Sequence, residues 1–389
     1  MTTPRSRREF IVAGLALPVA AEAGTLVPQA PAKAPAVLPG AATKPPVIRK
    51  RTLGRTGLEV SEVAFGCMIT SDQSVIERAA DLGVNLFDTA RVYQGGNNER
   101  LVGAALKGRR DQVYISTKSG GEAKADVLQQ LDESLKQLGT DHVDIWYLHG
   151  KSKASELHDD LLEAQQIAKQ QGKIRFAGVS LHAGHAEVIP AAIAKKLDVV
   201  LMTQNFTMGP RNDALLQQLH DAGVGVVAMK VMAGGRGPEA AAQRKKLAEA
   251  GGMLSALKWV LRSPHVNATI PSITDMAQLD ENLRAMAEPW TPADEKVLSA
   301  RFEEIRHDYC SMCGQCEGAC PKGLAVADLL RFLTYADGYG QFALGREHFL
   351  SLPAAQRSVR CEDCASCPVR CPQGVAVARR LARAQQLFA

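Results

Sequence analysis

Eight of the nine cysteines lie in two short runs near the end of the chain, and both runs have the same spacing. In each run two residues separate the first three cysteines, three residues precede the fourth, and a proline follows it. A disulfide framework spreads its cysteines through a short secreted chain, whereas thiols gathered in one segment are typical of a metal-binding module. The predicted metal ligands are Cys310, Cys313, Cys316, Cys320, Cys361, Cys364, Cys367 and Cys371.

This spacing is the one that bacterial ferredoxins use, where three close cysteines bind one cubane and the fourth binds the neighbouring cluster. The sequence therefore predicts two [4Fe–4S] clusters with crossed ligands. One set is Cys310, Cys313, Cys316 and Cys371, and the other is Cys361, Cys364, Cys367 and Cys320. Zinc is the alternative metal, although sulfur-only zinc sites usually pair two CxxC units. The 40 residues between the runs, 321–360, contain helical segments, so this part of the chain resembles an α-helical ferredoxin.

The middle of the chain alternates short apolar runs with helical segments from residue 63 to about residue 287. Strands that are apolar at nearly every position are buried on both faces, as parallel sheets require. Eight such units predict a closed (β/α)8 TIM barrel, a fold of about 250 residues. An open doubly wound sheet is the alternative, but it normally carries a GxGxxG turn after its first strand, and this chain has none there. The predicted strands cover 63–66, 84–87, 113–116, 143–148, 174–179, 199–202, 224–228 and 266–270.

Polar side chains follow seven of the eight predicted strands. In a (β/α)8 barrel the carboxyl ends of the strands form the face that carries the chemistry. Any one of these side chains alone would more often be structural, but so many on one face predict an active site. They are Asp88, Lys118, His149, Ser180 with His182, Gln204 with Asn205, Lys230 and Ser272.

Four segments of this region resemble the aldo-keto reductases. They are residues 53–61 (LGRTGLEVS), 87–93 (FDTARVY), 116–118 (STK) and 148–149 (LH). The resemblance extends over about residues 51–290 and implies a hairpin at residues 51–62 that closes the floor of the barrel. It also implies an enzyme that interconverts a carbonyl and an alcohol with a catalytic tetrad. By position the tetrad falls on Asp88, Tyr93, Lys118 and His149.

A tyrosine that protonates a carbonyl oxygen needs assistance, because its ordinary pKa of about 10 makes it a weak acid at neutral pH. Lowering that pKa to about 7 corresponds to roughly 4 kcal/mol. An ammonium at about 4 Å supplies this energy at an effective dielectric constant of about 20, but only about 1 kcal/mol in bulk water. We therefore expect Lys118 to lower the pKa of Tyr93 inside a partly desolvated pocket, while Asp88 orients Lys118. His149 would hydrogen-bond the substrate carbonyl.

The resemblance further implies a nicotinamide dinucleotide, NADP or NAD, at the mouth of the barrel. The residues that would bind it are Ser180, Gln204 and Asn205 at the nicotinamide amide, Gly234 and Gly235 at the pyrophosphate, and Lys230, Ser272, Gln278 and Asn282. This chain departs from many family members at Leu181 and Met229, which stand in place of an asparagine and an aromatic residue. Ser272 and Gln278 stand where a lysine and an arginine often grip the 2′-phosphate, so the sequence leaves NAD and NADP open.

The N-terminal 50 residues predict an export signal followed by a tether. Arg7 and Arg8 precede a short apolar stretch at residues 10–21, and the pair resembles a twin-arginine signal. The expected domains are a signal peptide (1–24), an Ala/Pro-rich linker (25–50), the barrel (51–300) and the ferredoxin-like domain (301–389). A periplasmic location agrees with the cysteines, because twin-arginine export carries folded proteins whose clusters are inserted before the thiols meet an oxidising compartment.

Composition and charge exclude several classes of protein. Hydrophobic residues make up 46% and charged residues 22% of the 389 residues, which is unlike a disordered or collagen-like chain. The net charge of +5 resides in residues 1–50, so residues 51–389 balance to zero and carry no electrostatic footprint for nucleic acid. No apolar run reaches the roughly 18 residues of a membrane-spanning helix.

These features together predict an exported oxidoreductase of aldo-keto reductase type that acts on a small carbonyl or alcohol and carries two [4Fe–4S] clusters. Hydride transfer moves two electrons together whereas a cluster accepts one, and the sequence has no flavin motif. We therefore expect a tightly held nicotinamide cofactor or a redox partner protein. One alternative is an iron–sulfur electron-transfer protein whose barrel is a docking scaffold, and another is a structural protein stapled by zinc.

Overall fold

The structure, a computed structural model, describes residues 46–233 and 251–389. The predicted signal peptide (1–24), most of the predicted linker (25–50), and Gly234 and Gly235 lie outside the described residues. Residues Pro45–Ala389 form one compact unit, so the barrel and the C-terminal helices are parts of the same body.

In the described part of the chain, eight parallel strands form a single sheet in which each strand pairs with the next along the sequence. Parallel bridges from Val63 to Thr269 and from Gly66 to Ser272 join the first strand to the last, so the sheet closes on itself. The predicted (β/α)8 barrel is therefore confirmed. The strands are β3 (Phe65–Gly66), β4 (Leu86–Asp88), β5 (Tyr114–Ser119), β6 (Val143–Leu148), β7 (Ile174–Leu181), β8 (Val199–Thr203), β9 (Gly225–Met229) and β10 (Ala268–Thr269).

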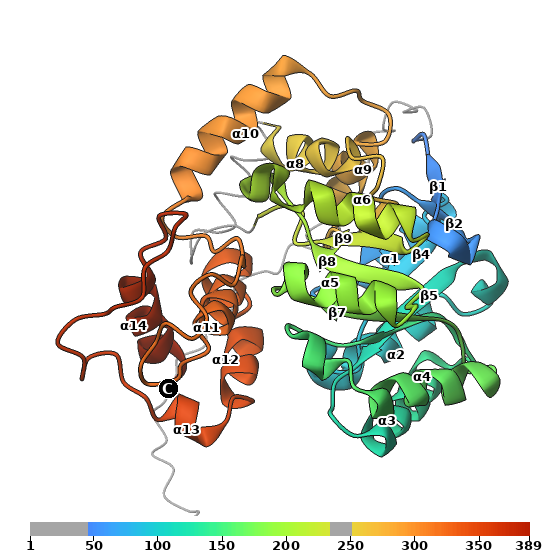
Figure 1. Cartoon of the computed structure of the whole chain (residues 1–389). Coiled ribbons are helices and arrows are strands. Elements are labelled where there is room, and N and C mark those ends of the chain that lie inside the picture. Colours follow the sequence, from blue (N-terminus) through green and yellow to red (C-terminus); the bar gives the residue numbers. More distant parts are fainter. Residues whose placement is uncertain (1–45, 234–250) are drawn as a thin grey trace, which may run out of the picture. The chain divides into compact units, whose positions relative to one another are not determined.

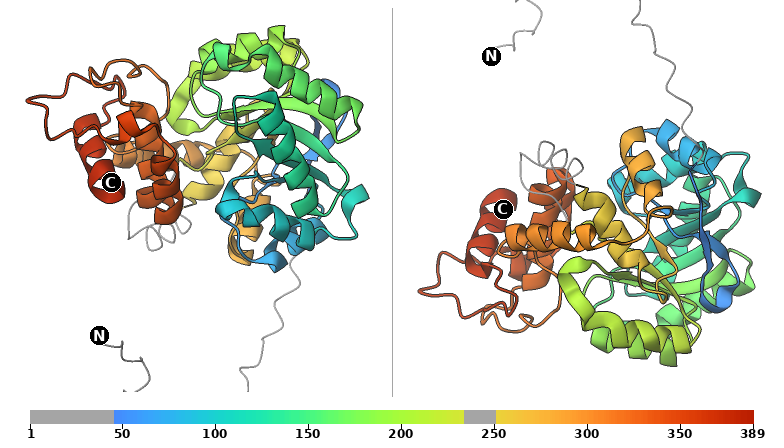
Figure 2. Two further views of the ribbon diagram at one scale, coloured as in Figure 1. Left: turned by 90° about the horizontal axis from the view of Figure 1, so that it is seen from below. Right: turned by 90° about the horizontal axis from the view of Figure 1, so that it is seen from above.

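Helices connect the strands and lie around the outside of the barrel (Figures 1 and 2). They are α1 (Gln73–Asp81), α2 (Asn97–Ala105), α3 (Lys124–Leu138), α4 (Asp159–Gln170), α5 (His185–Ala194), α6 (Asp213–Asp221), α8 (Gly252–Leu261) and α9 (Met276–Arg284). Each buries an apolar stripe, as α3 does with Val127, Leu131 and Leu135 at helical spacing. Gly139 ends α3 in the left-handed conformation (φ 66°) that glycine adopts without steric cost.

A hairpin closes the floor of the barrel, as the resemblance implied. β1 (Lys50–Thr52) pairs antiparallel with β2 (Glu59–Ser61), and Val60 is fully buried against the inner strands. Gly54, in the turn, lies so close to the barrel that a Cβ there would come within 2.3 Å of the Gly225 nitrogen. The turn therefore needs a residue without a side chain.

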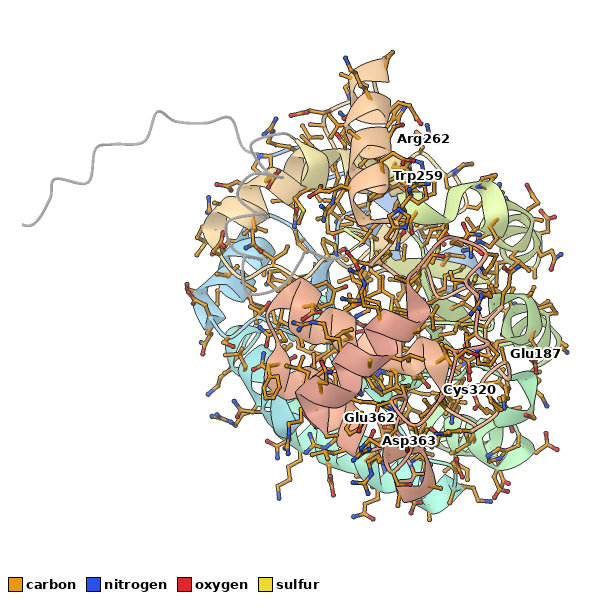
Figure 3. The ribbon with its side chains drawn as sticks, turned by 90° about the vertical axis from the view of Figure 1, so that its left-hand side faces the viewer. Glu187, Trp259, Arg262, Cys320, Glu362 and Asp363 are labelled. Atoms are coloured by element: carbon orange, nitrogen blue, oxygen red, sulfur yellow. The ribbon has the colours of Figure 1, made fainter. Side chains whose placement is uncertain are left out.

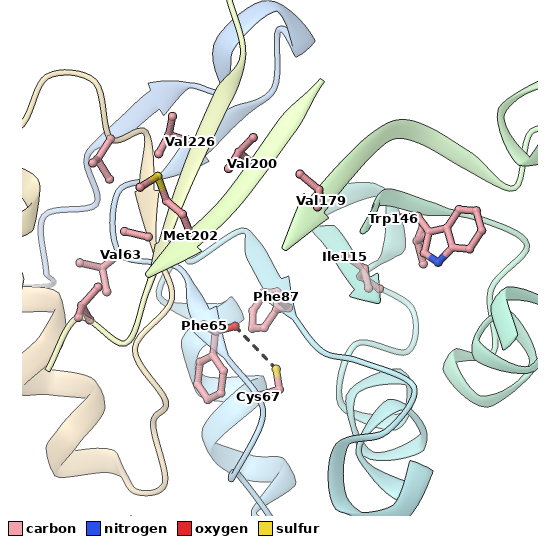
Figure 4. Close-up of a cluster of buried hydrophobic side chains, with 14 of the residues drawn as sticks. Val63, Phe65, Cys67, Phe87, Ile115, Trp146, Val179, Val200, Met202 and Val226 are labelled. Atoms are coloured by element: carbon pink, nitrogen blue, oxygen red, sulfur yellow. Dashed lines mark hydrogen bonds between the residues drawn. The ribbon is translucent and has the colours of Figure 1, made fainter. Parts of the chain in front are cut away.

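The layer between the strands and the helices is a continuous apolar core (Figure 4). The rings of Phe65 and Phe87 stack with centroids 5.8 Å apart. Cys67 lies beside them, fully buried, with its Sγ 3.8 Å from the Phe65 carbonyl oxygen. Burial raises the pKa of the Cys67 thiol well above its ordinary value, so this cysteine is a small packing residue and an unreactive thiol.

Beyond the barrel the chain continues in α10 (Pro292–Ile305) and then in a smaller helical region that carries both cysteine runs. That region has its own apolar core, in which Leu333, Phe349 and Phe388 are at most 3% exposed. A ferredoxin-like helical region after the barrel agrees with the predicted fold class. Its elements are α11 (Val326–Leu333), the π-helix η6 (Thr334–Gly338), α12 (Phe342–Leu350), α13 (Ala354–Arg357) and α14 (Val377–Phe388). No helix within the described ranges is long and apolar enough to span a bilayer.

A buried ion pair anchors α10 to the barrel helix α8. Lys258 Nζ lies 2.8 Å from Asp294 Oδ2, and both side chains are more than nine-tenths buried. Ser255 and Thr291 also donate hydrogen bonds to the Asp294 carboxylate. Burial by itself would raise the pKa of Asp294, but these partners outweigh it and hold the pKa at about 2.

Replacing this carboxylate tests the anchor. Asp294→Asn removes a group whose pKa is about 2 when folded, against about 3.9 in an unfolded chain, so we expect a loss of about 2 kcal/mol at pH 7. Because the folded pKa is the lower one, the loss stays constant above about pH 5 and shrinks as the pH falls towards 2. Urea unfolding followed by circular dichroism measures it. Glu295→Gln, an exposed neighbour, should change stability by less than about 0.5 kcal/mol, and an equal effect of both variants would contradict the anchor.

Candidate active site

The four residues of the predicted tetrad come from neighbouring strand ends. Asp88 ends β4, Lys118 lies near the end of β5, His149 follows β6, and Tyr93 begins a short 3-10 helix after β4. Asp88, Tyr93 and His149 line one cavity of about 600 Å³. Lys118 is buried beside it, with its Nζ 4.7 Å from the centre of the Tyr93 ring. The structure thus brings all four side chains together at the mouth of the barrel.

The ammonium of Lys118 is held by a buried ion pair. Its Nζ lies 2.5 Å from Asp88 Oδ2 and donates a second hydrogen bond of 2.7 Å to the Thr89 carbonyl. Ser116 donates its hydroxyl to the other carboxylate oxygen of Asp88 at 2.7 Å. Burial lowers the pKa of Lys118 and raises that of Asp88, while the attraction between the two charges opposes both shifts. The pair fixes one position for the ammonium against the Tyr93 ring.

The electrostatics of Tyr93 differ from our expectation. We expected Lys118 to lower the pKa of this phenol, but burial raises the pKa well above its ordinary value and the charge of Asp88 adds to the rise. The physical reason is that the Asp88 carboxylate compensates the charge of the Lys118 ammonium, whose hydrogen bonds go to Asp88 and Thr89. Tyr93 therefore keeps its proton at neutral pH.

His149 is a neutral polar group next to this phenol. The rings of Tyr93 and His149 meet edge to face with centroids 6.0 Å apart. Burial lowers the pKa of His149 well below its ordinary value, and the charge of Lys118 lowers it further. A neutral imidazole beside a protonated phenol offers hydrogen-bonding groups from two sides to a carbonyl oxygen placed between them.

The predicted cofactor residues differ in their positions relative to the cavity. Lys230, Ser272 and Gln278 line the same cavity as the tetrad, and the side chain of Gln278 also hydrogen-bonds Thr274 and Asp275. Asn282 is buried on α9 and is not among the cavity-lining residues. Gly234 and Gly235 belong to a segment outside the described residues.

The residues predicted to meet a nicotinamide amide are instead engaged with the protein. Ser180 accepts a hydrogen bond from the Gly150 amide, and Gln204 accepts one of 2.7 Å from Asn212. Asn205 donates from Nδ2 to the Lys230 carbonyl and to the hydroxyl of Tyr309, which immediately precedes the first cysteine of the C-terminal runs. Ser180, Gln204 and Asn205 are at most 2% exposed and are absent from the cavity lining, although Ser180 lies beside the segment that carries His149.

Sequence reasoning missed a group of cavity residues that comes from the C-terminal helices. Lys230, from the barrel, lies with its Nζ 4.4 Å from the Tyr335 ring centre and 5.1 Å from that of Tyr339. These positions are separated by about a hundred residues, and no local pattern joins them. In the structure Tyr335 lies in the π-helix η6, and π-helices are frequent at functional sites. The C-terminal residues that line the cavity are Arg331, Tyr335, Gly338, Tyr339 and His348.

Tyr335 differs from Tyr93 in its electrostatic environment. Its burial would raise the pKa of the phenol, but the charges of Lys230 and Arg331 outweigh burial and lower the pKa below its ordinary value. Arg331 also approaches the hydroxyl directly, with 3.4 Å between NH1 and the phenol oxygen. One cavity therefore holds two buried tyrosines whose pKa values are shifted in opposite directions.

The first group of C-terminal cysteines gathers around Cys310. Burial raises the pKa of Cys310 to about 12, and the neighbouring thiols of Cys316, Cys313 and Cys371 add to the rise. Cys371 comes from the second run, 55 residues after Cys316 in the chain. The thiols that act on Cys310 thus include one from the second run, and they belong to the set that the spacing predicts for one cluster.

The second group surrounds a cavity of about 360 Å³ that is lined by Cys320, Cys361, Cys364 and Cys367. Figure 3 labels Cys320 together with Glu362, which directly follows Cys361. In the described part of the chain, no three His, Cys, Asp or Glu side chains are close enough to hold a single metal ion. Four thiols around a cavity fit the all-sulfur ligand set of a [4Fe–4S] cluster.

Two protein families match this chain in succession. The aldo/keto reductase family matches residues 70–299, and the 4Fe-4S dicluster domain matches residues 300–376. The uncharacterized oxidoreductase YqkF of Bacillus subtilis is 30% identical over 301 residues, covering 66% of this chain and 97% of that protein. L-galactose dehydrogenase of Arabidopsis thaliana is 28% identical over 289 residues, covering 62% of this chain and 89% of that enzyme.

The fold has solved counterparts as well. The holo form of an aldo-keto reductase from Bacillus halodurans superposes with a TM-score of 0.56 at 27% identity. The superposition covers 65% of this chain and 96% of that one. The part of this chain that the superposition does not cover is similar in length to the segments that lie outside the predicted barrel.

The contrast between the two phenols can be measured. We expect Tyr335→Phe to remove the first phase of phenolate absorbance in an alkaline titration, because Lys230 and Arg331 favour the ionised form of Tyr335. Tyr93→Phe should leave that first phase intact, since burial raises the pKa of Tyr93. Ultraviolet difference spectra against wild-type protein at equal cluster content provide the readout. An early phase that survives in Tyr335→Phe would contradict the assignment.

Proposed function

The chain belongs to the aldo/keto reductase family, and on this premise we propose that it is an oxidoreductase that interconverts a small carbonyl compound and the corresponding alcohol. The observation that carries the proposal is the convergence of Asp88, Tyr93 and His149 on one cavity with Lys118 buried beside it. An electron-transfer protein with a barrel as scaffold would have no use for a buried ion pair aimed at a phenol.

NAD(P) dependence is typical of the family, and the cavity offers part of what such a cofactor needs. Ser272 and Gln278 line it and would hold a nicotinamide dinucleotide, with NAD and NADP both open. When bound, this cofactor supplies or accepts a hydride at the substrate carbon. Ser180, Gln204 and Asn205 would take part only after exchanging their present hydrogen bonds.

In the proposed mechanism Tyr93 is the proton donor. It holds its proton until negative charge develops on the carbonyl oxygen, and then transfers it from Oη to that oxygen to give the alcohol. Lys118, fixed over the Tyr93 ring by Asp88, stabilises the phenolate that remains. His149 orients the carbonyl as a neutral hydrogen-bonding group. The reverse reaction uses the same atoms in the opposite order.

We further propose two [4Fe–4S] clusters with crossed ligands in the dicluster domain. Each cluster would pass one electron at a time, so a redox partner protein, in addition to the small-molecule substrate, completes the electron balance. The predicted twin-arginine signal supports a periplasmic location, because that pathway exports proteins after their clusters have been assembled. Arg7 and Arg8 are the residues on which this part of the proposal depends.

Removing one hydroxyl tests the enzymatic proposal. Tyr93→Phe should lower kcat by about 100-fold or more, because the alkoxide loses its proton donor, and KM should change little. Tyr114→Phe at the other end of β5 is the matched control and should retain turnover. Steady-state kinetics with a panel of carbonyl compounds, at equal iron content, give the measurement. Full turnover by Tyr93→Phe would favour the electron-transfer alternative.

The crossed ligation has its own test. Cys371→Ser should reduce the iron and acid-labile sulfide of anaerobically purified protein to about half, because it removes a ligand from one cluster and leaves the other set complete. Cys67→Ala should leave both contents unchanged, since Cys67 is packed within the barrel. Loss of all iron in Cys371→Ser, or none, would contradict two independent sets, and zinc in place of iron would support the structural alternative.

A further inference from the structure

The cavity carries two cations that the tetrad does not use. Lys230 follows β9 and Arg331 lies on α11, and both line the cavity. Within the described residues no carboxylate forms an ion pair with Lys230, whose ammonium instead faces the rings of Tyr335 and Tyr339. Arg331 pairs at 2.5 Å with Asp328, a side chain that is 46% exposed. Water screens that carboxylate, so it offsets little of the charge inside the cavity.

The other acidic side chains that line the cavity do not pair with Lys230 or Arg331 in the described structure. Asp88 is paired with Lys118. Asp275 caps α9 by accepting hydrogen bonds from the amide and the side chain of Gln278. Glu281 lies on the same helix, and its pKa is raised by burial and not lowered by a cavity cation. As far as the described ranges show, Lys230 and Arg331 thus face the cavity without a buried carboxylate as partner.

The field of these two cations reaches the reacting end of the cavity. Besides burial, Arg331 and Lys230 both help to lower the pKa of His149, His182 and His348. The Nδ1 atom of His182 is buried without a hydrogen-bond partner in the structure. Three neutral histidines and the phenol of Tyr335 therefore line a region of positive potential, which would favour the binding of an anion.

We propose that Lys230, Arg331 and Tyr335 form a subsite for a carboxylate group of the substrate. The preferred substrates would then be carbonyl or hydroxy compounds that carry a carboxylate. This inference rests on the proposed function for its substrate, although the subsite can be tested without turnover. A carboxylate would compensate the two cations and accept hydrogen bonds from the lysine, the arginine and the phenol. Within the described residues the partner of Lys230 is a phenol and that of Arg331 is a half-exposed carboxylate, so binding should gain from a carboxylate placed between the two cations.

The position of the cations favours the substrate over the cofactor as the source of the anion. Both cations lower the pKa of His149, and the charge of Arg331 also opposes the rise that burial causes in the pKa of Tyr93. An anion between Lys230 and Arg331 would therefore lie near the group that is reduced. Ser272 and Gln278, the residues expected at the adenosine end of a dinucleotide, belong to the β10–α9 side of the cavity.

The test uses the full-length protein with its clusters and two probes of similar shape, succinate and its neutral counterpart succinamide. Isothermal titration calorimetry should show that wild-type protein binds succinate at least tenfold more tightly than succinamide. Arg331→Gln should weaken succinate binding about tenfold or more and leave succinamide binding unchanged. Arg346→Gln, an exposed arginine on α12, is the matched control and should alter neither. If Arg331→Gln loses its clusters, Lys230→Gln replaces it in the same comparison.

Equal binding of the two probes, or of succinate to wild type and Arg331→Gln, would overturn the subsite. A second arm measures NAD and NADP binding in the same proteins. If the dinucleotide competes with succinate and loses the same factor in Arg331→Gln, the cations serve cofactor phosphates and the proposal is wrong. Turnover by Tyr93→Phe together with selective succinate binding would instead refute the proposed function and leave the subsite standing.

Discussion

The buried ion pair between Lys118 and Asp88 is the constraint on which the rest of the site depends. Two charges out of water are stable only when each is fully hydrogen-bonded, and here Thr89 and Ser116 supply the remaining bonds. The pair requires neighbouring strands in fixed register, which the closed barrel provides through β4 and β5. The ion pair holds the Lys118 ammonium in one position, where it lies over the face of the Tyr93 ring.

Tyr93 and Tyr335 illustrate how environment, not residue type, decides acidity in one cavity. Both phenols are buried, which raises a phenol pKa. Tyr335 has Arg331 near its hydroxyl and Lys230 over its ring, and these two charges reverse the shift. Lys118 lies against the ring of Tyr93 and is largely neutralised by Asp88, so burial prevails there. A proton donor that remains protonated and a second phenol in a positive field can thus work within one site.

Much of the fold could be predicted because its signals are local. The signals are the buried parallel strands, the polar residues that end them and the repeated cysteine spacing, and each lies within a short stretch of sequence. The barrel geometry then brings the strand-end residues together at one face. The hydrogen bonds of Gln204 and Asn205 could not be foreseen, because their partners follow from loop packing. Arg331 and Tyr335 were missed for the same reason: nothing near them indicates that a helix of the C-terminal region would line the barrel mouth. The effect of Lys118 on Tyr93 could not be foreseen, because it depends on burial and on how far the Asp88 carboxylate compensates the ammonium.

Residues of the C-terminal region and of the barrel line the same cavity, so the two parts of the chain form one site. Tyr309 immediately precedes a predicted cluster ligand and accepts a hydrogen bond from Asn205 of the barrel, while Tyr335 lies under Lys230. A cluster bound by the neighbouring cysteines would therefore also support the wall of the cavity. Metal binding contributes folding free energy wherever the unoccupied site is loosely held. The C-terminal region thus contributes to the cavity as well as carrying the cysteine runs, and the barrel residues supply only part of the lining.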